Sequence, residues 1–202
     1  MNKIFFETIK IVDGKIYNLV YHQKRYERVL DDFGVKIKQE LQSFIKPPEN
    51  GVYRCRLVYD ISKIPHTVDV TYHKYIKRDI SSLKIINCNS VDYRYKYTNR
   101  EELDALFELR GECDDVLIVK NDLVTDTTIA NIAFFDGSRW ITPRKPLLMG
   151  TTRERLLKEG KIFEADVYAK DIKIFTKVTL LNAMIDFDII TQNQKDIFCW
   201  KE

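Results

Sequence analysis

Near the middle of the chain, residues 92–100 read Asp-Tyr-Arg-Tyr-Lys-Tyr-Thr-Asn-Arg. Lys96 stands among aromatic residues just before Thr98, which has the spacing of a helix capping box with Glu101. The positive end of a helix dipole and nearby cations disfavour an ammonium group, so they lower the pKa of a lysine placed there. Schiff-base chemistry with a carbonyl needs such a lysine. The plainer and commoner alternative is an exposed lysine among charges.

Outward from this stretch, strand-like and helical sequence alternate. Content of Val, Ile, Tyr and Thr predicts strands at residues 5–11, 15–20, 52–59, 67–75, 83–91, 116–119, 129–135, 140–142, 177–181, 187–191 and 197–200. Apolar spacing and stop signals predict helices at residues 22–33 and 37–45, after a capping box at 98–101, and after a second one at 151–154. The pattern predicts an α+β fold with two lobes, a small one over residues 1–80 and a larger, barrel-like one over residues 81–202.

Composition narrows the class of protein. The 202 residues are 45% hydrophobic and 31% charged, which is typical of a globular chain. The net charge of +3 is spread along the sequence, which argues against nucleic-acid binding. No apolar run approaches a membrane span, and the first residues lack the features of a signal peptide, so we expect a cytoplasmic protein without a membrane partner.

Cysteine and histidine spacing gives no metal signature. The four cysteines stand at positions 55, 88, 113 and 199, and the three histidines at 22, 66 and 73 are equally scattered. No pair has the close spacing of a zinc or dithiol motif. We expect no metal site and reduced, mostly buried thiols.

Three further segments carry residue types suited to a phosphate or a polar ring. His22 and Arg25 share a helix face, where the arginine can fork onto a phosphate; a solvated helix face is the alternative. Asp126 stands among threonines between two apolar runs, where a turn is the alternative. Residues 150–152 read Gly-Thr-Thr at a helix start, which offers N–H groups and hydroxyls to an anion or forms an ordinary cap.

Together the four segments match the needs of one cofactor. Pyridoxal 5'-phosphate (PLP) requires a lysine for the imine, an acid beside the pyridine nitrogen, and cations and amides around the phosphate. Their order resembles the class IV aminotransferase family, the PLP enzymes of the branched-chain and D-amino acid aminotransferase fold. The resemblance implies that two-lobed fold, a homodimer and a small amino substrate.

The resemblance also implies roles for individual residues. Lys96 corresponds to the Schiff-base lysine, and Arg25 to the arginine that binds the phosphate. Asp126, followed by Asn131, corresponds to the segment whose acid pairs with the pyridine nitrogen, although the family usually has a glutamate there. The segment holding Thr151 and Thr152 resembles the phosphate cup, and Asn182 falls where the family brings a loop near the phosphate and substrate.

Two details bear on the reaction. Residues 96–100 and 181–184 look more like the aminodeoxychorismate lyase branch, whose reaction releases pyruvate, than like the branched-chain branch. An amino acid transaminase is the alternative, and a degenerate protein that binds without catalysis is a third reading. Arg54 and Arg56 are candidates for the substrate carboxylate; equally, they can form a charged outer face while Cys55 and Leu57 point inward.

Overall fold

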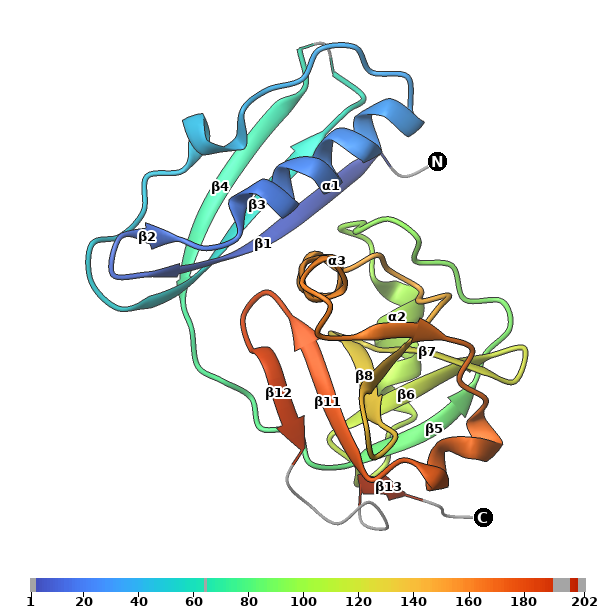
Figure 1. The fold of residues 1–202 in the computed structure, drawn as a ribbon. Coiled ribbons are helices and arrows are strands. Elements are labelled where there is room, and N and C mark those ends of the chain that lie inside the picture. The colour runs from blue at the N-terminus through green and yellow to red at the C-terminus, as the bar shows by residue number, and fades with distance from the viewer. Residues whose placement is uncertain (1–2, 64, 191–196, 200–202) are drawn as a thin grey trace. The chain divides into compact units, whose positions relative to one another are not determined.

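The computed structural model describes residues 3–63, 65–190 and 197–199. The chain forms two compact units, the first made of Met1–Lys77 with Tyr95–Asn99 and the second of Arg78–Arg94 with Arg100–Glu202 (Figure 1). The segment around Lys96 therefore packs with the first unit. Among the described residues, no helix is both long and apolar enough to cross a membrane.

The first unit is built on an antiparallel sheet in the order β2-β1-β3-β4. These strands are β1 (Ile4–Val12), β2 (Lys15–Ile16), β3 (Val52–Asp60) and β4 (Thr67–Lys74). Asp13 and Gly14 both have positive φ, 45° and 75°, which is the geometry of a tight two-residue hairpin turn. The predicted turn is thus confirmed, although the second strand stops at Ile16.

One face of this sheet is covered by helix α1 (Leu19–Asp32), as Figure 1 shows. The helix buries Tyr26, Val29 and Leu30 against the sheet because these positions share one helical face. The sheet contributes alternate residues to this core: Phe5, Ile9, Ile11, Cys55, Leu57 and Tyr59. The intervening residues of the strands lie on the opposite face, which α1 does not cover. The second predicted helix is reduced to a 3-10 turn, Leu41–Phe44.

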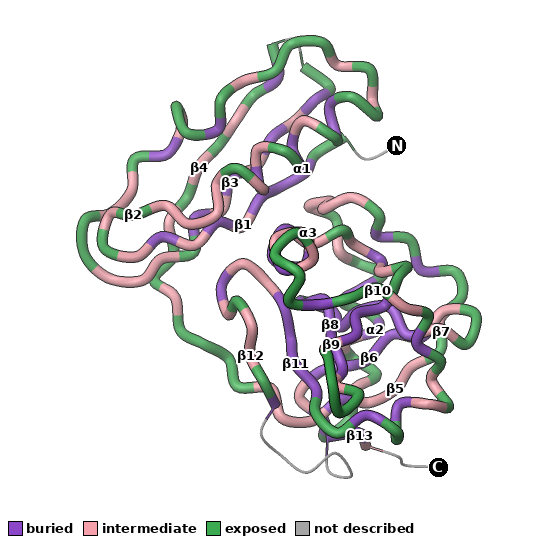
Figure 2. Tube along the Cα trace, viewed as in Figure 1, coloured by how far each residue is buried: buried purple, intermediate pink, exposed green. Residues whose placement is uncertain are grey.

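The second unit is a mixed sheet in the order β10-β9-β8-β7-β6-β5-β13, with β11 paired to β8 and β12 to β11. The strands are β5 (Leu83–Asn87), β6 (Asp115–Lys120), β7 (Leu123–Thr127), β8 (Asn131–Phe135), β9 (Trp140–Pro143), β10 (Phe163–Ala165), β11 (Lys177–Asn182), β12 (Asp186–Ile190) and β13 (Phe198–Cys199). Helices α2 (Glu101–Glu108) and α3 (Thr151–Lys158) and the 3-10 turn Ala169–Ile174 complete the unit. Strands β6 and β8 are almost wholly buried (Figure 2). The predicted α+β class is confirmed; residues 191 and 200 of the predicted last strands lie outside the described residues.

The two predicted capping boxes are wrong. Neither α2 nor α3 has a side-chain hydrogen bond at its N-cap, which is Arg100 in α2 and Gly150 in α3. The hydroxyl of Thr98 instead donates to the carbonyl of Ile4, because residues 96–98 run alongside β1.

The prediction of four reduced thiols is also wrong. Cys113 and Cys199 form a disulfide across 86 residues of sequence, with their Cα atoms 6.7 Å apart. Strand β13 pairs in parallel with β5, and β5 pairs with β6, which begins two residues after Cys113. This long-range pairing brings the two cysteines together, and no local spacing signals it. Cys55 and Cys88 remain free thiols.

Candidate active site

Lys96 is held against the edge of β1. The backbone N–H of Phe6 donates to the carbonyl of Lys96 at 2.9 Å, and Tyr97 forms an antiparallel bridge with Phe5. The Lys96 Nζ atom lies 4.6 Å from the centroid of the Phe6 ring. A cation at this distance from an aromatic face is attracted to it. The amine is thus positioned by backbone pairing on one side and a buried ring on the other.

His22 and Arg25 point to a buried carboxylate rather than to solvent. His22 Nδ1 lies 2.6 Å from Glu7 Oε2, while Arg25 donates through Nε to Oε1 at 2.9 Å and through Nη2 to Oε2 at 2.5 Å. The three side chains are buried, so the alternative of a solvated helix face is wrong. Both oxygens of Glu7 thus accept hydrogen bonds from one edge of the Arg25 guanidinium, in a two-pronged pair.

The charges of this cluster are interdependent. Burial alone would raise the pKa of Glu7, but the Arg25 charge and the hydrogen bonds from His22 and Arg25 lower it to about 2. Burial lowers the pKa of His22, and the charges of Arg25 and Lys96 lower it further against the opposing effect of Glu7. Among the described residues, His22 Nε2 is buried without a hydrogen-bond partner. An orphaned polar atom of this kind is costly unless a bound group satisfies it.

Arg54 and Arg56 lie on the face of the sheet that α1 leaves open. Cys55 and Leu57 point into the core, as the alternating pattern predicts. The Arg56 guanidinium carbon lies 3.9 Å from the centroid of the Phe6 ring, the same ring that Lys96 contacts. The charged outer face is therefore also the face on which Lys96 presents its amine.

In the second unit, Asp126 is a buried carboxylate near the end of β7. Its Oδ1 accepts a hydrogen bond from Asn131 Nδ2 at 2.7 Å, and its Oδ2 accepts one from the backbone N–H of Leu148 at 2.9 Å. Burial raises the pKa of Asp126 to about 6, although both hydrogen bonds and the Arg153 charge lower it. Within the described parts of the chain, no cation forms an ion pair with Asp126.

Gly150 and Asn131 approach each other too closely for any side chain at position 150. A Cβ atom built on Gly150 would lie 1.9 Å from Asn131 Oδ1. Asn131 cannot easily turn away, because its Nδ2 donates to the Leu148 carbonyl at 2.8 Å as well as to Asp126. Gly150 is followed by Thr151 and Thr152, both buried in the first turn of α3. The acid and the start of this helix therefore form one packed arrangement.

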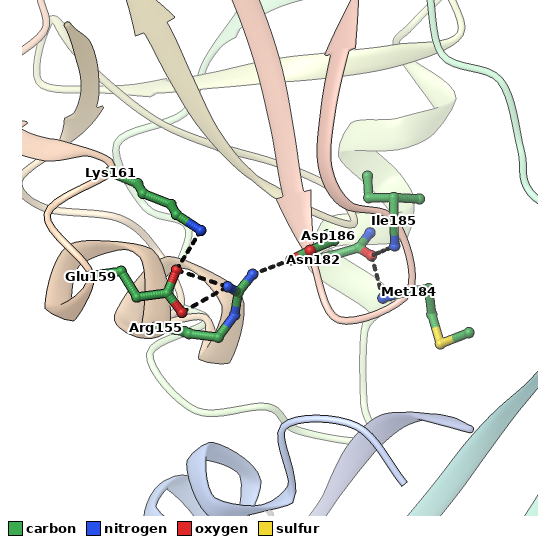
Figure 3. A network of polar contacts seen from close by, with 7 residues as sticks. All are labelled: Arg155, Glu159, Lys161, Asn182, Met184, Ile185 and Asp186. Atoms are coloured by element: carbon green, nitrogen blue, oxygen red, sulfur yellow. Dashed lines mark hydrogen bonds and ion pairs between the residues drawn. The ribbon is translucent and has the colours of Figure 1, made fainter. Parts of the chain in front are cut away.

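Asn182 lies at the turn between β11 and β12 (Figure 3). Its Oδ1 accepts hydrogen bonds from the backbone N–H groups of Met184 and Ile185, so this oxygen shapes the turn. Its Nδ2 donates to the carbonyl of Ile129 at 3.3 Å, in the turn that joins β7 to β8. Asn182 is thus close to the segment that carries Asp126 and Asn131.

A charged network joins this turn to α3. Arg155 donates to Asp186 at the start of β12 and, through Nη1, to Glu159 at 2.9 Å. Lys161 also pairs with Glu159 at 2.9 Å (Figure 3). The helix that begins after Gly150 is therefore tied to the turn that holds Asn182.

The predicted site residues thus fall into two groups, one in each unit. The first unit contains Arg25, Arg54, Arg56 and Lys96, and the second contains Asp126, Asn131, Thr151, Thr152 and Asn182. Within the first unit, Phe6 joins Lys96 to Arg56. Within the second, hydrogen bonds and close packing join Asp126 to Asn131 and Gly150.

Two charged residues that contact or lie near the predicted site residues, Glu7 and Arg153, were not among the site residues predicted from the sequence. Glu7 accepts hydrogen bonds from His22 and Arg25. The sequence does indicate its burial, because Glu7 alternates with Phe5, Ile9 and Ile11 on the inward-facing side of one strand. Arg153 is buried and donates to the Pro143 carbonyl at 2.8 Å and to Glu164 at 2.6 Å. No local pattern predicts the pairing with Glu164, because Arg153 lies in helix α3 and Glu164 lies 11 residues later, in strand β10.

The amino-acid sequence is similar to one protein family and to curated relatives. Residues 4–192 match the family model described as Amino-transferase class IV. An uncharacterised Haemophilus influenzae protein is 40% identical over 186 residues, 89% of this chain and 96% of its own length. A Schizosaccharomyces pombe protein, named provisionally as an aminodeoxychorismate lyase, is 28% identical, covering 80% of this chain and 76% of its own.

Solved structures show the same fold. A crystal structure from Haemophilus somnus, provisionally named as a 4-amino-4-deoxychorismate lyase, has a TM-score of 0.80 and 32% identity over 91% of this chain and 97% of its own. The branched-chain amino acid aminotransferase of Escherichia coli has a TM-score of 0.76 at 12% identity, over 97% of this chain and 78% of its own.

Proposed function

Since the chain belongs to the amino-transferase class IV family, we propose that it is a PLP-dependent enzyme acting on a small amino substrate. Lys96 is the residue whose amine would bond to the cofactor aldehyde. Arg25, Thr151, Thr152 and Asn182 would hold the phosphate, and Asp126 with Asn131 would bind the ring nitrogen.

The observation that supports this proposal most directly is that Asp126 is a buried carboxylate with a raised pKa. A buried carboxylate without a cationic partner is costly, and its pKa is accordingly raised to about 6. Its oxygens accept hydrogen bonds from Asn131 and from the Leu148 N–H, and a carboxylate has about four acceptor positions in all. A protonated pyridine nitrogen is a donor and a cation of the kind this carboxylate needs. The orphaned Nε2 of His22 and the buried threonine hydroxyls of α3 are further polar groups suited to a bound polar molecule.

Asp126 and Lys96 have different roles in the proposed reaction. PLP supplies an electron sink for negative charge that develops on the substrate α-carbon. Asp126 keeps the ring nitrogen protonated, which is what makes the sink effective. The Lys96 amine would remove and return a proton at the substrate α-carbon, as general base and acid. Its fixed place against Phe6 keeps the amine within a narrow range of positions.

For the substrate, we propose a lyase acting on a compound like 4-amino-4-deoxychorismate, with release of pyruvate. The two relatives that bear this name, and the sequence around Lys96 and Asn182, support the lyase over a transaminase. Arg54 and Arg56 are the cations for the substrate carboxylate, because both lie on the sheet face where Lys96 presents its amine.

The cofactor assignment is tested by trapping. Purified protein incubated with PLP and then reduced with borohydride should carry a pyridoxyl group on the peptide that contains Lys96. Lys96→Ala should abolish the label and the visible absorption band, whereas Lys36→Ala, an exposed lysine of the same unit, should keep both. A protein that stays colourless with added PLP is a binding module without this chemistry.

Product analysis distinguishes the lyase from a transaminase. Aminodeoxychorismate should yield pyruvate, and a panel of amino donors with keto acids should give slower turnover. The reverse ranking would make the protein a transaminase. We also propose a cytoplasmic homodimer, which sedimentation and cell fractionation can check.

A further inference from the structure

Asp115 is a buried acid of the second unit that the proposed chemistry does not use. It is the first residue of β6, and it is fully buried. Its Oδ1 atom accepts hydrogen bonds from the Thr128 hydroxyl at 2.6 Å and from the Val116 N–H at 2.8 Å. Thr128 lies in the turn that joins β7 to β8, so this carboxylate oxygen fixes that turn to the start of β6.

The other carboxylate oxygen of Asp115 makes packing a poor explanation for this residue. Among the described residues, Asp115 Oδ2 is buried without a hydrogen-bond partner, and burial raises the pKa of Asp115. Buried polar atoms without partners are uncommon in folded proteins because they lower stability. An apolar residue would avoid this cost, but it would give the Thr128 hydroxyl no acceptor.

The turn held by Asp115 connects two residues of the candidate site. Asp126 and Asn131 are register partners across the hairpin, and Asn131 Nδ2 donates to Asp126 Oδ1 at 2.7 Å. Residues 127–130 lie between them, and Thr127 closes this segment by donating its N–H to the Ala130 carbonyl at 2.9 Å. In so short a connection, a displacement of the turn also displaces the amide of Asn131.

Other elements bind the same turn through its carbonyl groups. Arg100 Nη2 donates to the Thr128 carbonyl at 2.9 Å, and Asn182 Nδ2 donates to the Ile129 carbonyl at 3.3 Å. Asp115 adds a contact through a side chain, because it accepts from the Thr128 hydroxyl. Thr128 is thus held at two groups, as expected for a residue that supports a binding site from behind.

We propose that Asp115 is a positioning residue: through the Thr128 hydroxyl it fixes the β7–β8 turn, so that Asn131 keeps its amide on Asp126. This inference rests on the proposed function, which assigns Asp126 and Asn131 to the ring nitrogen of PLP. Asp115 therefore strengthens the hold on the cofactor while acting only through other residues.

Two substitutions remove the Asp115–Thr128 hydrogen bond from opposite ends. Asp115→Ala and Thr128→Val should each raise the dissociation constant of PLP about tenfold, which is the loss expected for one hydrogen bond to a carboxylate. The double variant should bind PLP about as weakly as either single variant, because both changes remove the same interaction. Thr128→Ser keeps the hydroxyl and should restore the wild-type dissociation constant.

A measurement on protein without PLP separates positioning from a general loss of stability. The side-chain amide protons of Asn131 are held by Asp126 and the Leu148 carbonyl, so they exchange with solvent when this arrangement opens. Asp115→Ala should speed this exchange, measured by NMR, about tenfold more than that of the buried β11 backbone amides, which report global unfolding.

Asp114→Ala is the matched control. It removes the neighbouring carboxylate, whose Oδ2 atom accepts hydrogen bonds from Ser81 and Ser82 instead of from the turn. This variant should keep the wild-type PLP dissociation constant and the wild-type ratio of Asn131 to β11 exchange. Urea unfolding of every variant verifies that it is folded under the conditions of the binding assay.

Three results would overturn the positioning role: wild-type PLP affinity in Thr128→Val, equal weakening in Asp114→Ala, or Asn131 exchange that rises only in step with β11. Borohydride trapping at Lys96 tests the proposed function separately. A labelled Lys96 with unchanged affinity in Thr128→Val refutes the positioning role alone. Failed labelling of the wild type refutes the cofactor chemistry, and the Asn131 exchange rates still decide whether Asp115 holds the turn.

Discussion

Replacement of Gly150 by alanine is a sharp test of how Asp126 is held. The backbone of Gly150 has φ −71° and ψ 142°, which alanine adopts without strain. By conformational preference alone, the substitution should therefore be neutral or slightly stabilising. The added Cβ atom, however, would lie 1.9 Å from Asn131 Oδ1, far inside contact distance. Asn131 must move.

The cost of that movement follows from what Asn131 binds. Its Nδ2 donates to Asp126 at 2.7 Å and to the Leu148 carbonyl at 2.8 Å, and Asn131 and Asp126 are buried. A buried acceptor left without its donor costs about 1–3 kcal/mol, and more when it is charged. We expect Gly150→Ala to lower the free energy of unfolding by about 3 kcal/mol. Losing the Asn131 hydrogen bond should also raise the pKa of Asp126 further and weaken PLP binding.

A double-mutant cycle in urea isolates the clash. Asn131→Ala removes the obstructing amide, so Gly150→Ala in that background should cost less than about 1 kcal/mol. Visible absorption during PLP titration gives a second measurement on the same four proteins. Additive losses in the double variant, or a Gly150→Ala protein as stable as the wild type, would refute the proposed packing of the acid against α3.

Further predictions concern buried charge and the disulfide. Glu7→Gln should destabilise the protein by about 3–5 kcal/mol in urea unfolding, because Arg25 stays buried without its carboxylate; an unchanged midpoint would contradict the buried pair. Since the folded pKa of Glu7 is about 2, its contribution is complete above pH 4.5 and should be lost as the pH falls towards 2. Asp126 has the opposite sign: its raised pKa favours the protonated folded state, so protein without cofactor should lose about 2 kcal/mol of stability as the pH rises from 4 to 6, and Asp126→Asn should remove this slope. Cys113→Ser should cost about 4 kcal/mol of stability under oxidising conditions and nothing in excess dithiothreitol; a thiol titration finding four free groups in unreduced protein would argue against the disulfide.

Local chemistry made much of the fold predictable. Alternating apolar residues identify β1 and β3, the Asp13-Gly14 pair identifies the first turn, and the spacing of Tyr26, Val29 and Leu30 identifies α1. These features depend on residues a few positions apart, so the sequence contains the whole signal. The same is true of the residue types at Lys96 and Asp126, whose order along the chain resembles the family.

Capping and cysteine pairing were mispredicted for one reason. Thr98 has the spacing of a cap, but β1 offers its hydroxyl a carbonyl that is 94 residues away in sequence. Cys199 has no neighbouring cysteine, yet the pairing of β13 with β5 brings it to Cys113. Competing partners that are distant in sequence decide both outcomes, and no local pattern records them.

The sequence by itself therefore determined the class of fold, the main strands and helices, and the kinds of side chain available for chemistry. Only the tertiary structure decided which of them are neighbours: Glu7 against Arg25, Arg56 and Lys96 on one ring, and Asn131 wedged against Gly150. The physical reason is that periodicity and propensity act over a few residues. Burial, charge pairing and close contact depend on distances in space, which exist only once the strands have paired.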